Sequence, residues 1–509
     1  MIQKLSLLDI MSNQQLLFKG MLRKIADEDQ ESMKGKLIHG IFWNLISALA
    51  SQGFPMIAAI IAARLLSKFG YGQLGMINST VILFSTFAGL GLGITATKYI
   101  AQLYQTDRGR TGRIMGLTNL LGITSGVVMC ILLIITAPWL ASNVLAAPDL
   151  GSVLRIASLI LIFNTIVGIQ SGSIAGFGAF RELARIAVIQ GVISGCLVVT
   201  GVYFFGLTGA VVAMVTNSFV NLLLYKQVVN NLVKRFGIKI DYLLSWREKD
   251  ILWKLSFPSM LSSVMVGPVL WIANIIIINT AGGYGQLGLF NAADQWKAAL
   301  SFFPLVIGGV LLPMVSANVN KENRALEIVN VLASWIIVII IALPLISFPE
   351  IIAFFYGHDY YSTVFLQSLA LMMLVSCMLS YKEGIARKLV AKNLMWWGFL
   401  SNLVWGILFL GSLLVFKKFG SLGLAMSYTI SYSINTLIFV PFYLSRNVVQ
   451  KDLIISWEVA LVWIVLILQT CLTILNVSLW IRFISMMISI GALGFSFYNI
   501  WNSNLNSGR

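Results

Sequence analysis

Two segments of the chain, YGQLGMIN (residues 71–78) and YGQLGLFN (residues 284–291), share six of eight residues at a separation of 213 positions. A second pair, FGLTGAVVAM from Phe205 and FGSLGLAMSY from Phe419, recurs at a separation of 214. Two matches at nearly one spacing indicate that a single unit of chain occurs twice. The composition of the whole chain shows what kind of unit is repeated.

The chain is too apolar for a soluble protein. Of its 509 residues, 58% are hydrophobic and 11% are charged, whereas soluble domains have about 45–50% apolar and about 25% charged residues. A helix needs about 20 mostly apolar residues to cross a bilayer, and the sequence predicts fourteen such spans in an all-α, polytopic membrane protein. They cover residues 41–63, 74–96, 114–136, 153–173, 186–204, 207–228, 255–278, 286–313, 327–348, 361–380, 394–415, 421–443, 456–475 and 480–500.

The basic residues predict the orientation in the membrane. The net charge is +16, and most of the 35 Lys and Arg residues fall in alternate connections between the spans. Cytoplasmic connections carry the excess of Lys and Arg, so we expect both termini in the cytoplasm and a multi-pass protein of the cell (inner) membrane. The same pattern accounts for the basic charge without nucleic acid as a partner.

The repeat and the connections divide the chain into five parts. Residues 1–36 are a charged cytoplasmic tail, either an amphipathic helix on the membrane surface or a loosely ordered segment. Residues 37–228 form an N-lobe (spans 1–6), and residues 229–252 form a cytoplasmic linker. Residues 253–445 form a C-lobe (spans 7–12), and residues 446–509 hold spans 13 and 14 with the C-terminal tail.

Two six-span units that enter the membrane from the same side are parallel repeats, which predicts a cavity between them and transport by alternating access. The YGQLG segments are expected in outer loops, where Gly72 and Gly285 permit tight turns. No G-x-x-x-x-G-K-[ST] segment is present, so the chain holds no ATPase motif. The sequence also contains no metal-spaced Cys/His cluster, and the outer connections are too short for an enzyme's catalytic loop.

Polar residues within spans 7 and 8 are the main candidate site, since such residues usually face a cavity. Asp294 and Lys297 lie one turn apart, near Asn291. In the functional interpretation Lys297 binds an anion, while Asp294 binds a coupling cation or holds Lys297 in place. In the alternative interpretation the two residues form a structural ion pair near the outer surface. Trp271 and Asn274 could stack on and hydrogen-bond to a sugar, or Trp271 could anchor the span at the interface.

Five further residues complete the predicted site. Asn78 corresponds to Asn291 in the repeat, and Arg64 ends span 1, where it either reaches the headgroups or points into the cavity. Lys98, Arg181 and Lys392 end helices on the cytoplasmic side. They either reflect only the excess of basic residues on the cytoplasmic side, or they bind phosphate at the cytoplasmic mouth of the cavity.

Residues 41–102, IFWNLISALASQGFPMIAAIIAARLLSKFGYGQLGMINSTVILFSTFAGLGLGITATKYIAQ, resemble the N-terminal part of bacterial Wzx-type O-antigen and exopolysaccharide flippases. These belong to the multidrug/oligosaccharidyl-lipid/polysaccharide (MOP) exporter superfamily. The segments ARLLSKFGYGQLG and GLGITATKYIA carry the similarity, which continues more weakly to about residue 450. Fourteen spans are typical of this branch, whereas drug exporters of the superfamily usually have twelve.

The resemblance implies a V-shaped fold, a cationic cavity, and transfer of undecaprenyl-pyrophosphate-linked oligosaccharide from the inner to the outer leaflet for surface polysaccharide synthesis. It also implies a polysaccharide polymerase and a chain-length regulator as partners, alongside membrane lipids. The alternatives are a cation-coupled multidrug exporter and a lipid II flippase. Lipid II flippases place several arginines in their first spans, whereas span 1 here has Arg64 alone. A coupling cation, Na⁺ or H⁺, is the one cofactor left open.

Overall fold

The computed structural model describes residues 33–257, 260, 265–317, 324–392 and 394–506, and these residues form helices and turns without a strand. This confirms the all-α class. Of the tail predicted at residues 1–36, residues 1–32 lie outside the described part of the chain. Large apolar side chains such as Phe204 and Leu437 are about 70% exposed, as expected for a surface that faces lipid.

Helices cover all fourteen predicted spans within the described residues. The N-lobe holds α2 (Met33–Gly89), α3 (Leu92–Leu103), α4 (Arg108–Trp139), η1 (Leu140–Val144), α5 (Leu150–Ala157), α6 (Leu159–Gly176) and α7 (Phe180–Phe236). The C-lobe holds η3 (Leu252–Ser256), α9 (Val266–Ile278), α10 (Gly283–Ala317), α11 (Arg324–Ser347), α12 (Glu350–Tyr356), η4 (His358–Tyr360), α13 (Thr363–Ala391), α14 (Met395–Phe416), η5 (Lys417–Phe419) and α15 (Ser421–Ser445). The chain ends with η6 (Lys451–Leu453), α16 (Trp457–Ile474) and α17 (Leu479–Asn506).

Nine helices among the described residues are long and apolar enough to cross a membrane. This number is below fourteen partly because α2 and α7 each hold two predicted spans, joined at a sharp kink. The kinks lie at Ser67 (φ 56°) in α2 and Gly206 (φ 56°, ψ −135°) in α7. Gly420, which matches Gly206 in the repeated FG segment, has nearly the same conformation (φ 59°, ψ −124°). Glycine adopts this region without a steric penalty, and the agreement supports the predicted duplication.

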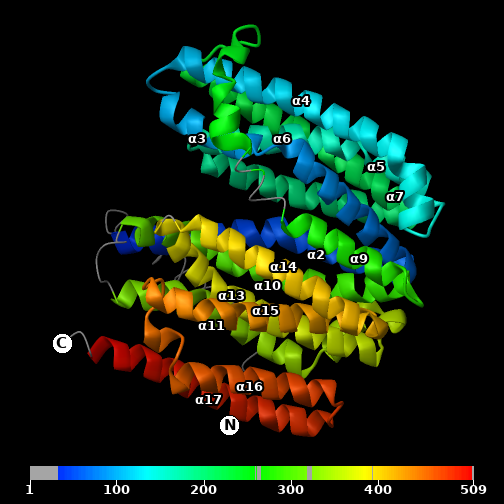
Figure 1. The fold of residues 1–509 in the computed structure, drawn as a ribbon, viewed down its shortest axis with the longest axis vertical. Coiled ribbons are helices and arrows are strands. Elements are labelled where there is room, and N and C mark those ends of the chain that lie inside the picture. The colour runs from blue at the N-terminus through cyan, green and yellow to red at the C-terminus, as the bar shows by residue number, and fades with distance from the viewer. Residues whose placement is uncertain (1–32, 258–259, 261–264, 318–323, 393, 507–509) are drawn as a thin grey trace, which may run out of the picture.

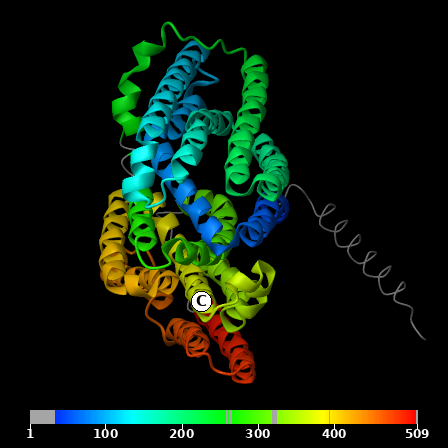
Figure 2. The same ribbon diagram turned by 90° about the vertical axis from the view of Figure 1, so that its right-hand side faces the viewer.

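The helices are arranged in three groups (Figures 1 and 2). Helices α3 to α7 form one group, α10, α11 and α13 to α15 form the middle group, and α16 and α17 pack on the far side of the middle group. Helix α2 contacts both α7 and α10, so it joins the first two groups. We call the end of the bundle with both YGQLG segments the motif end. The opposite end, which holds Lys98, Arg110 and Lys392, is the basic end.

The last two helices are fastened to the C-lobe away from the N-lobe. The rings of Trp335, Tyr381 and Trp463 pack with centroids 4.9 to 5.7 Å apart, joining α11, α13 and α16. Buried Arg482 of α17 pairs with Glu350 at 2.7 Å and donates to the carbonyl of Ser347. Spans 13 and 14 therefore buttress the C-lobe instead of lining the space between the lobes.

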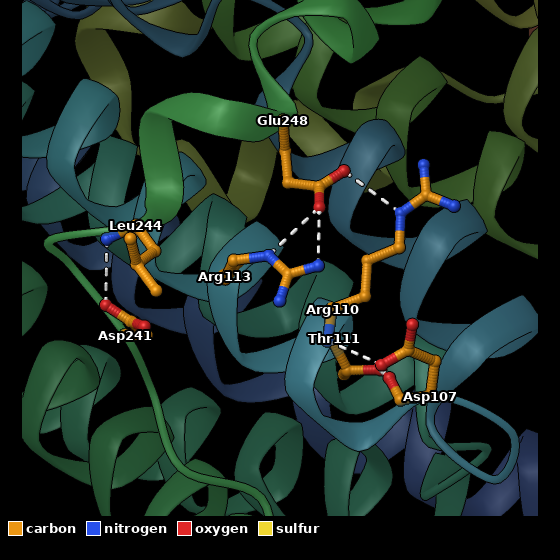
Figure 3. Close-up of polar contacts among 7 residues, drawn as sticks. All are labelled: Asp107, Arg110, Thr111, Arg113, Asp241, Leu244 and Glu248. Atoms are coloured by element: carbon orange, nitrogen blue, oxygen red, sulfur yellow. Dashed lines mark hydrogen bonds and ion pairs between the residues drawn. The ribbon is translucent and has the colours of Figure 1, made fainter.

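The segment predicted as the linker, residues 229–252, is held against the N-lobe at the basic end (Figure 3). Helix α7 continues through its first residues to Phe236, and Gly237 ends that helix in the left-handed conformation. The short helix η2 (Ser245–Glu248) then docks on the first turn of α4. There Glu248 pairs with Arg110 at 3.0 Å and with Arg113 at 3.1 Å.

We expect Glu248→Gln to lower the apparent unfolding midpoint by about 1 °C, because a mostly buried carboxylate shared by two arginines contributes about 1 kcal/mol in a chain of this length. The side chain of Glu248 is 9% exposed. The control is Glu182→Gln, which removes the exposed pair between Glu182 and Arg185 and should leave the midpoint unchanged. Thermal unfolding of the purified protein in detergent measures both, and equal midpoints for the two variants would contradict a structural role for the Glu248 pair.

Candidate functional site

A cavity of about 440 Å³ lies between the lobes, bounded by α2, α7, α9, α10 and α15. We call it the central cavity. Four of the predicted site residues line it: Asn78, Asn274, Asn291 and Asp294. They come from α2, α9 and α10, so the structure brings together polar residues that lie about 200 positions apart in the sequence.

The central cavity has little charge. Among its described lining residues, Asp294 is the one charged side chain. Lys297 is not among the residues that line the cavity. It pairs with Asp294, and its ammonium lies 4.6 Å from the ring centroid of Tyr428. The cationic cavity implied by the resemblance is therefore not found in this lining, because the lysine is turned toward its carboxylate and an aromatic ring.

Two asparagines on facing helices, Asn78 and Asn291, line the cavity. The Nδ2 atom of Asn291 is buried and has no hydrogen-bond partner among the described residues. A buried amide donor without a partner carries a free-energy cost of about 1–3 kcal/mol. Asn78 on the facing helix is exposed to the cavity. These amides are therefore available to a polar ligand.

Trp271 and Arg64 lie outside the lining of the central cavity. The indole nitrogen of Trp271 donates to Thr80 Oγ1 at 3.0 Å and so bridges α9 and α2. Arg64 lies beside Gly357 in the connection between α12 and η4. The structure thus separates Trp271 from Asn274, its proposed partner in sugar binding.

The three predicted phosphate residues lie at the basic end in different settings. Lys98 and Arg181 are exposed, on α3 and in the first turn of α7. Lys392 donates to the carbonyls of Arg446 (3.1 Å) and Asn447 (2.7 Å), after the end of α15. Burial, followed by the charge of Lys388, lowers the pKa of Lys392. Of the three, Lys98 and Arg181 are the better placed to meet an anion.

The two YGQLG segments pack against each other at the motif end. A methyl group at Gly72 would lie 1.9 Å from the carbonyl oxygen of Tyr284, and one at Gly288 would lie 1.8 Å from that of Lys68. The predicted turns at Gly72 and Gly285 are not found, because both glycines are helical and the turns lie earlier, at Ser67 and Gly282. Glycine is required at Gly72 and Gly288 so that the backbones of α2 and α10 can approach closely.

We call this close contact of α2 and α10 at Gly72 and Gly288 the glycine seam. Tyrosine hydroxyls beside it form hydrogen bonds between the lobes. Tyr71 donates to Gln295 Oε1 at 2.7 Å, and Tyr284 donates to the carbonyl of Leu145 at 2.7 Å. Tyr360 donates to the carbonyl of Ala63 at 3.3 Å. Together with the glycine contacts, these bonds hold the lobes together at the motif end of the cavity.

Sequence reasoning missed Lys382. It follows the span predicted at residues 361–380, which leaves it in a connection, but α13 extends to Ala391 and keeps Lys382 within the helix bundle. Its ammonium donates to Asn435 Oδ1 at 2.6 Å and lies 5.4 Å from the ring centroid of Tyr432. The signal was the polar run after Tyr381, which ends the apolar stretch without ending the helix. A helix can continue past the last apolar residue where neighbouring helices supply partners.

Comparisons with known proteins agree on fold and family. The model of the polysaccharide biosynthesis protein family matches residues 37–319. The "EPS I polysaccharide export inner membrane protein EpsE" of Ralstonia solanacearum is 22% identical over 401 residues, covering 75% of this chain and 88% of that protein. Among solved structures, the lipid II flippase MurJ in an inward closed conformation aligns with a TM-score of 0.68 and 15% identity, over 91% of this chain and 99% of that one. A multidrug resistance MATE family transporter of the MOP superfamily, inward-facing, aligns with a TM-score of 0.60 and 14% identity, over 80% and 98%.

Proposed function

The chain belongs to the polysaccharide biosynthesis protein family and has the fold of MOP-superfamily transporters, and from this we propose that it is a flippase for lipid-linked oligosaccharides. It moves an undecaprenyl-pyrophosphate-linked oligosaccharide from the cytoplasmic to the outer leaflet of the inner membrane by alternating access. The observation that carries the proposal is the central cavity, with three asparagines and one carboxylate in a largely apolar lining, between two lobes that are joined by a glycine seam at one end.

The distribution of basic residues supports the orientation of the protein in the membrane. Cytoplasmic connections are rich in Lys and Arg, so we assign the basic end and both termini to the cytoplasm. The lobes are then closed on the outer side, where Tyr71 bonds to Gln295. Further cavities follow α2 and α3 from Asn78 past Ser85 to Gly93, toward the basic end. This arrangement corresponds to a state that receives its substrate from the cytoplasmic leaflet.

We assign coupling to Asp294. It is the one carboxylate in the described lining of the cavity, and Lys297 holds it in place. A cation, Na⁺ or H⁺, that competes with Lys297 for Asp294 would link ion binding to movement of α10. The product, a lipid-linked oligosaccharide in the outer leaflet, is the substrate for a polymerase, and a chain-length regulator acts as a further partner. The protein itself acts as a transporter and not as an enzyme.

Two specific observations rank the alternatives. The family match favours polysaccharide over drug export, although both kinds of transporter share the fold. A lipid II flippase is disfavoured because the described cavity lining contains no arginine, and Arg64 lies outside it.

Reconstitution in vesicles tests the proposal directly. A polyprenyl diphosphate disaccharide with a fluorophore on the sugar is placed in proteoliposomes, and an impermeant quencher reports which leaflet holds it. We expect the protein to speed the exchange between leaflets at least tenfold over protein-free vesicles. Exchange no faster than in protein-free vesicles would contradict the assignment. As a second measurement, deletion of the coding sequence should abolish surface polysaccharide without altering resistance to cationic drugs.

A further inference from the structure

A second polar cavity, of about 480 Å³, lies within the N-lobe, bounded by α2, α6 and both arms of α7. We call it the amide pocket. It shares Asn78, Ile82, Ser194 and Met214 with the central cavity, so the two are continuous. Of its polar lining residues the sequence pointed to Asn78 alone, because the others follow no recognisable spacing along α2, α6 and α7.

The lining of the amide pocket is polar but uncharged. Five side-chain amides face it, from Asn78, Asn164, Gln190, Asn217 and Asn221. Hydroxyl side chains from α2 and α7 complete its polar lining, and its described lining includes no Asp, Glu, Lys or Arg. Such a composition is unusual within a membrane protein, where polar groups without a partner carry a cost.

Three polar atoms in this pocket lack partners among the described residues. The Oδ1 atoms of Asn217 and Asn221 and the Oγ atom of Ser85 are buried without a hydrogen bond. Asn221 is only 4% exposed as a whole residue. Buried polar groups in native proteins are nearly always hydrogen-bonded, so these atoms indicate a ligand that hydrogen-bonds to them.

Resting on the function proposed above, we propose that the amide pocket is the subsite for the sugar of the lipid-linked substrate and that this sugar is uncharged. Each amide offers both donors and an acceptor, which matches the hydroxyl groups of a sugar. Apolar side chains in the same lining, such as Val81 and Ile160, can pack against the C–H groups of the sugar ring. The volume falls in the range of roughly 300–1,000 Å³ usual for small-ligand sites.

The absence of charge sets the specificity. The carboxylate of an acidic sugar would enter the described pocket without a cationic partner, and an unpaired buried charge is strongly unfavourable. A metal cation would meet neutral oxygens alone, with no carboxylate in the described lining to balance its charge. The pocket therefore favours a neutral, hydroxyl-rich ligand over both.

Binding to the purified full-length protein in detergent tests the inference with three probes. They are a polyprenyl diphosphate with no sugar, the same lipid with one glucose, and the same lipid with one glucuronic acid. We expect the glucose lipid to bind about tenfold more tightly than the bare lipid, as for one or two added hydrogen bonds. The glucuronic acid lipid should bind no more tightly than the bare lipid. Equal affinity for the glucose lipid and the bare lipid, or a preference for glucuronic acid, would overturn the inference.

Variants then locate the subsite. Asn217→Leu combined with Asn221→Leu should remove the tenfold gain from glucose and leave the affinity for the bare lipid unchanged. The milder combination of Ser85→Ala and Ser194→Ala should reduce the gain in affinity from glucose. It replaces the first double variant if that variant does not fold. The control Thr216→Val lies on the same helix, where its hydroxyl bonds to the carbonyl of Val212, and should keep the full gain. Retention of the gain in both folded pocket variants would place the sugar elsewhere.

The outcomes separate this inference from the proposed function. If the wild-type protein bound none of the three lipids, the flippase assignment itself would fail. A sodium arm distinguishes a cation site in the amide pocket: exchange of K⁺ for Na⁺ should change the unfolding midpoint equally in the wild type and in the Asn217 and Asn221 variant. A rise in Na⁺ that is lost in the Asn217 and Asn221 variant would overturn the sugar subsite.

Discussion

Replacing Gly72 with alanine will abolish transport, whereas the same replacement at Gly285, its counterpart in the repeat, will be tolerated. A methyl group at Gly72 would lie 1.9 Å from the carbonyl oxygen of Tyr284, and backbone atoms cannot move aside alone. At Gly285 the nearest atom would be the Lys68 side chain at 3.8 Å, an ordinary contact. Overpacking of this kind costs about 1–3 kcal/mol, which shifts the balance between closed and open motif ends about 5- to 150-fold.

Cysteine labelling measures this shift independently of transport. Ser79 lines the central cavity, so Ser79→Cys is introduced after the four native cysteines are replaced by alanine. An impermeant maleimide added from outside the cell should label position 79 in the Gly72→Ala background and spare it in the Gly285→Ala background. Gly53→Ala, in the same helix with no atom within 4 Å of the new methyl group, is a second control. Equal labelling in the Gly72→Ala and Gly285→Ala backgrounds would refute the seam as the outer closure.

The second large effect is expected at Lys297. Its replacement by alanine leaves the Asp294 carboxylate without the partner it has in the bundle. Removal of one partner of a buried ion pair costs about 3–5 kcal/mol. The side chain of Lys297 is 13% exposed and that of Asp294 is 34% exposed, so partial solvation of the remaining carboxylate reduces the cost below that range. We therefore expect Lys297→Ala to lower both the unfolding midpoint and the yield of surface polysaccharide severely.

A neutral double variant separates the structural role of the pair from its role in transport. Asp294→Asn with Lys297→Gln removes both charges, so the midpoint should return close to that of the wild type. If Asp294 couples a cation to transport, the exchange of labelled lipid in vesicles should remain lost in this folded variant. Recovery of both stability and transport would show that the pair is structural, which is the alternative reading of the two residues. Lys297→Arg is the control: it changes the size and shape of the side chain but keeps its positive charge.

The sequence predicted the membrane spans well because lipid imposes a simple rule on every crossing segment. Each run of about 20 apolar residues must form a helix that satisfies its own backbone, so composition alone locates it. Helix ends followed this rule less closely. The span predicted to end at residue 380 continues to Ala391, where the buried Arg387 bonds to Asn330 and Ser334 on α11. Those partners lie more than 50 residues away along the chain, beyond the reach of a local pattern.

The candidate site was predicted only in part. The clustering of Asn78, Asn274, Asn291 and Asp294 around one cavity agrees with their proposed role, which stays a prediction. Which atoms face the cavity depended on rotation of each helix about its axis. That rotation placed the Lys297 ammonium against the ring of Tyr428. It is also why the amides of α7 that line the amide pocket were found only in the folded chain.

The repeated YGQLG segment shows where the boundary between sequence and structure lies. The sequence by itself determined that the chain is an all-α membrane protein and that the segment occurs twice, because composition and repetition are properties of the chain alone. Only the tertiary structure decided that the copies meet, that Gly72 and Gly288 are closely packed, and that Gly285 is not. Two copies of one segment have the same surroundings only if a symmetry axis passes through their contact. Without such an axis, α2 and α10 turn different faces toward each other, so matching residues have different neighbours.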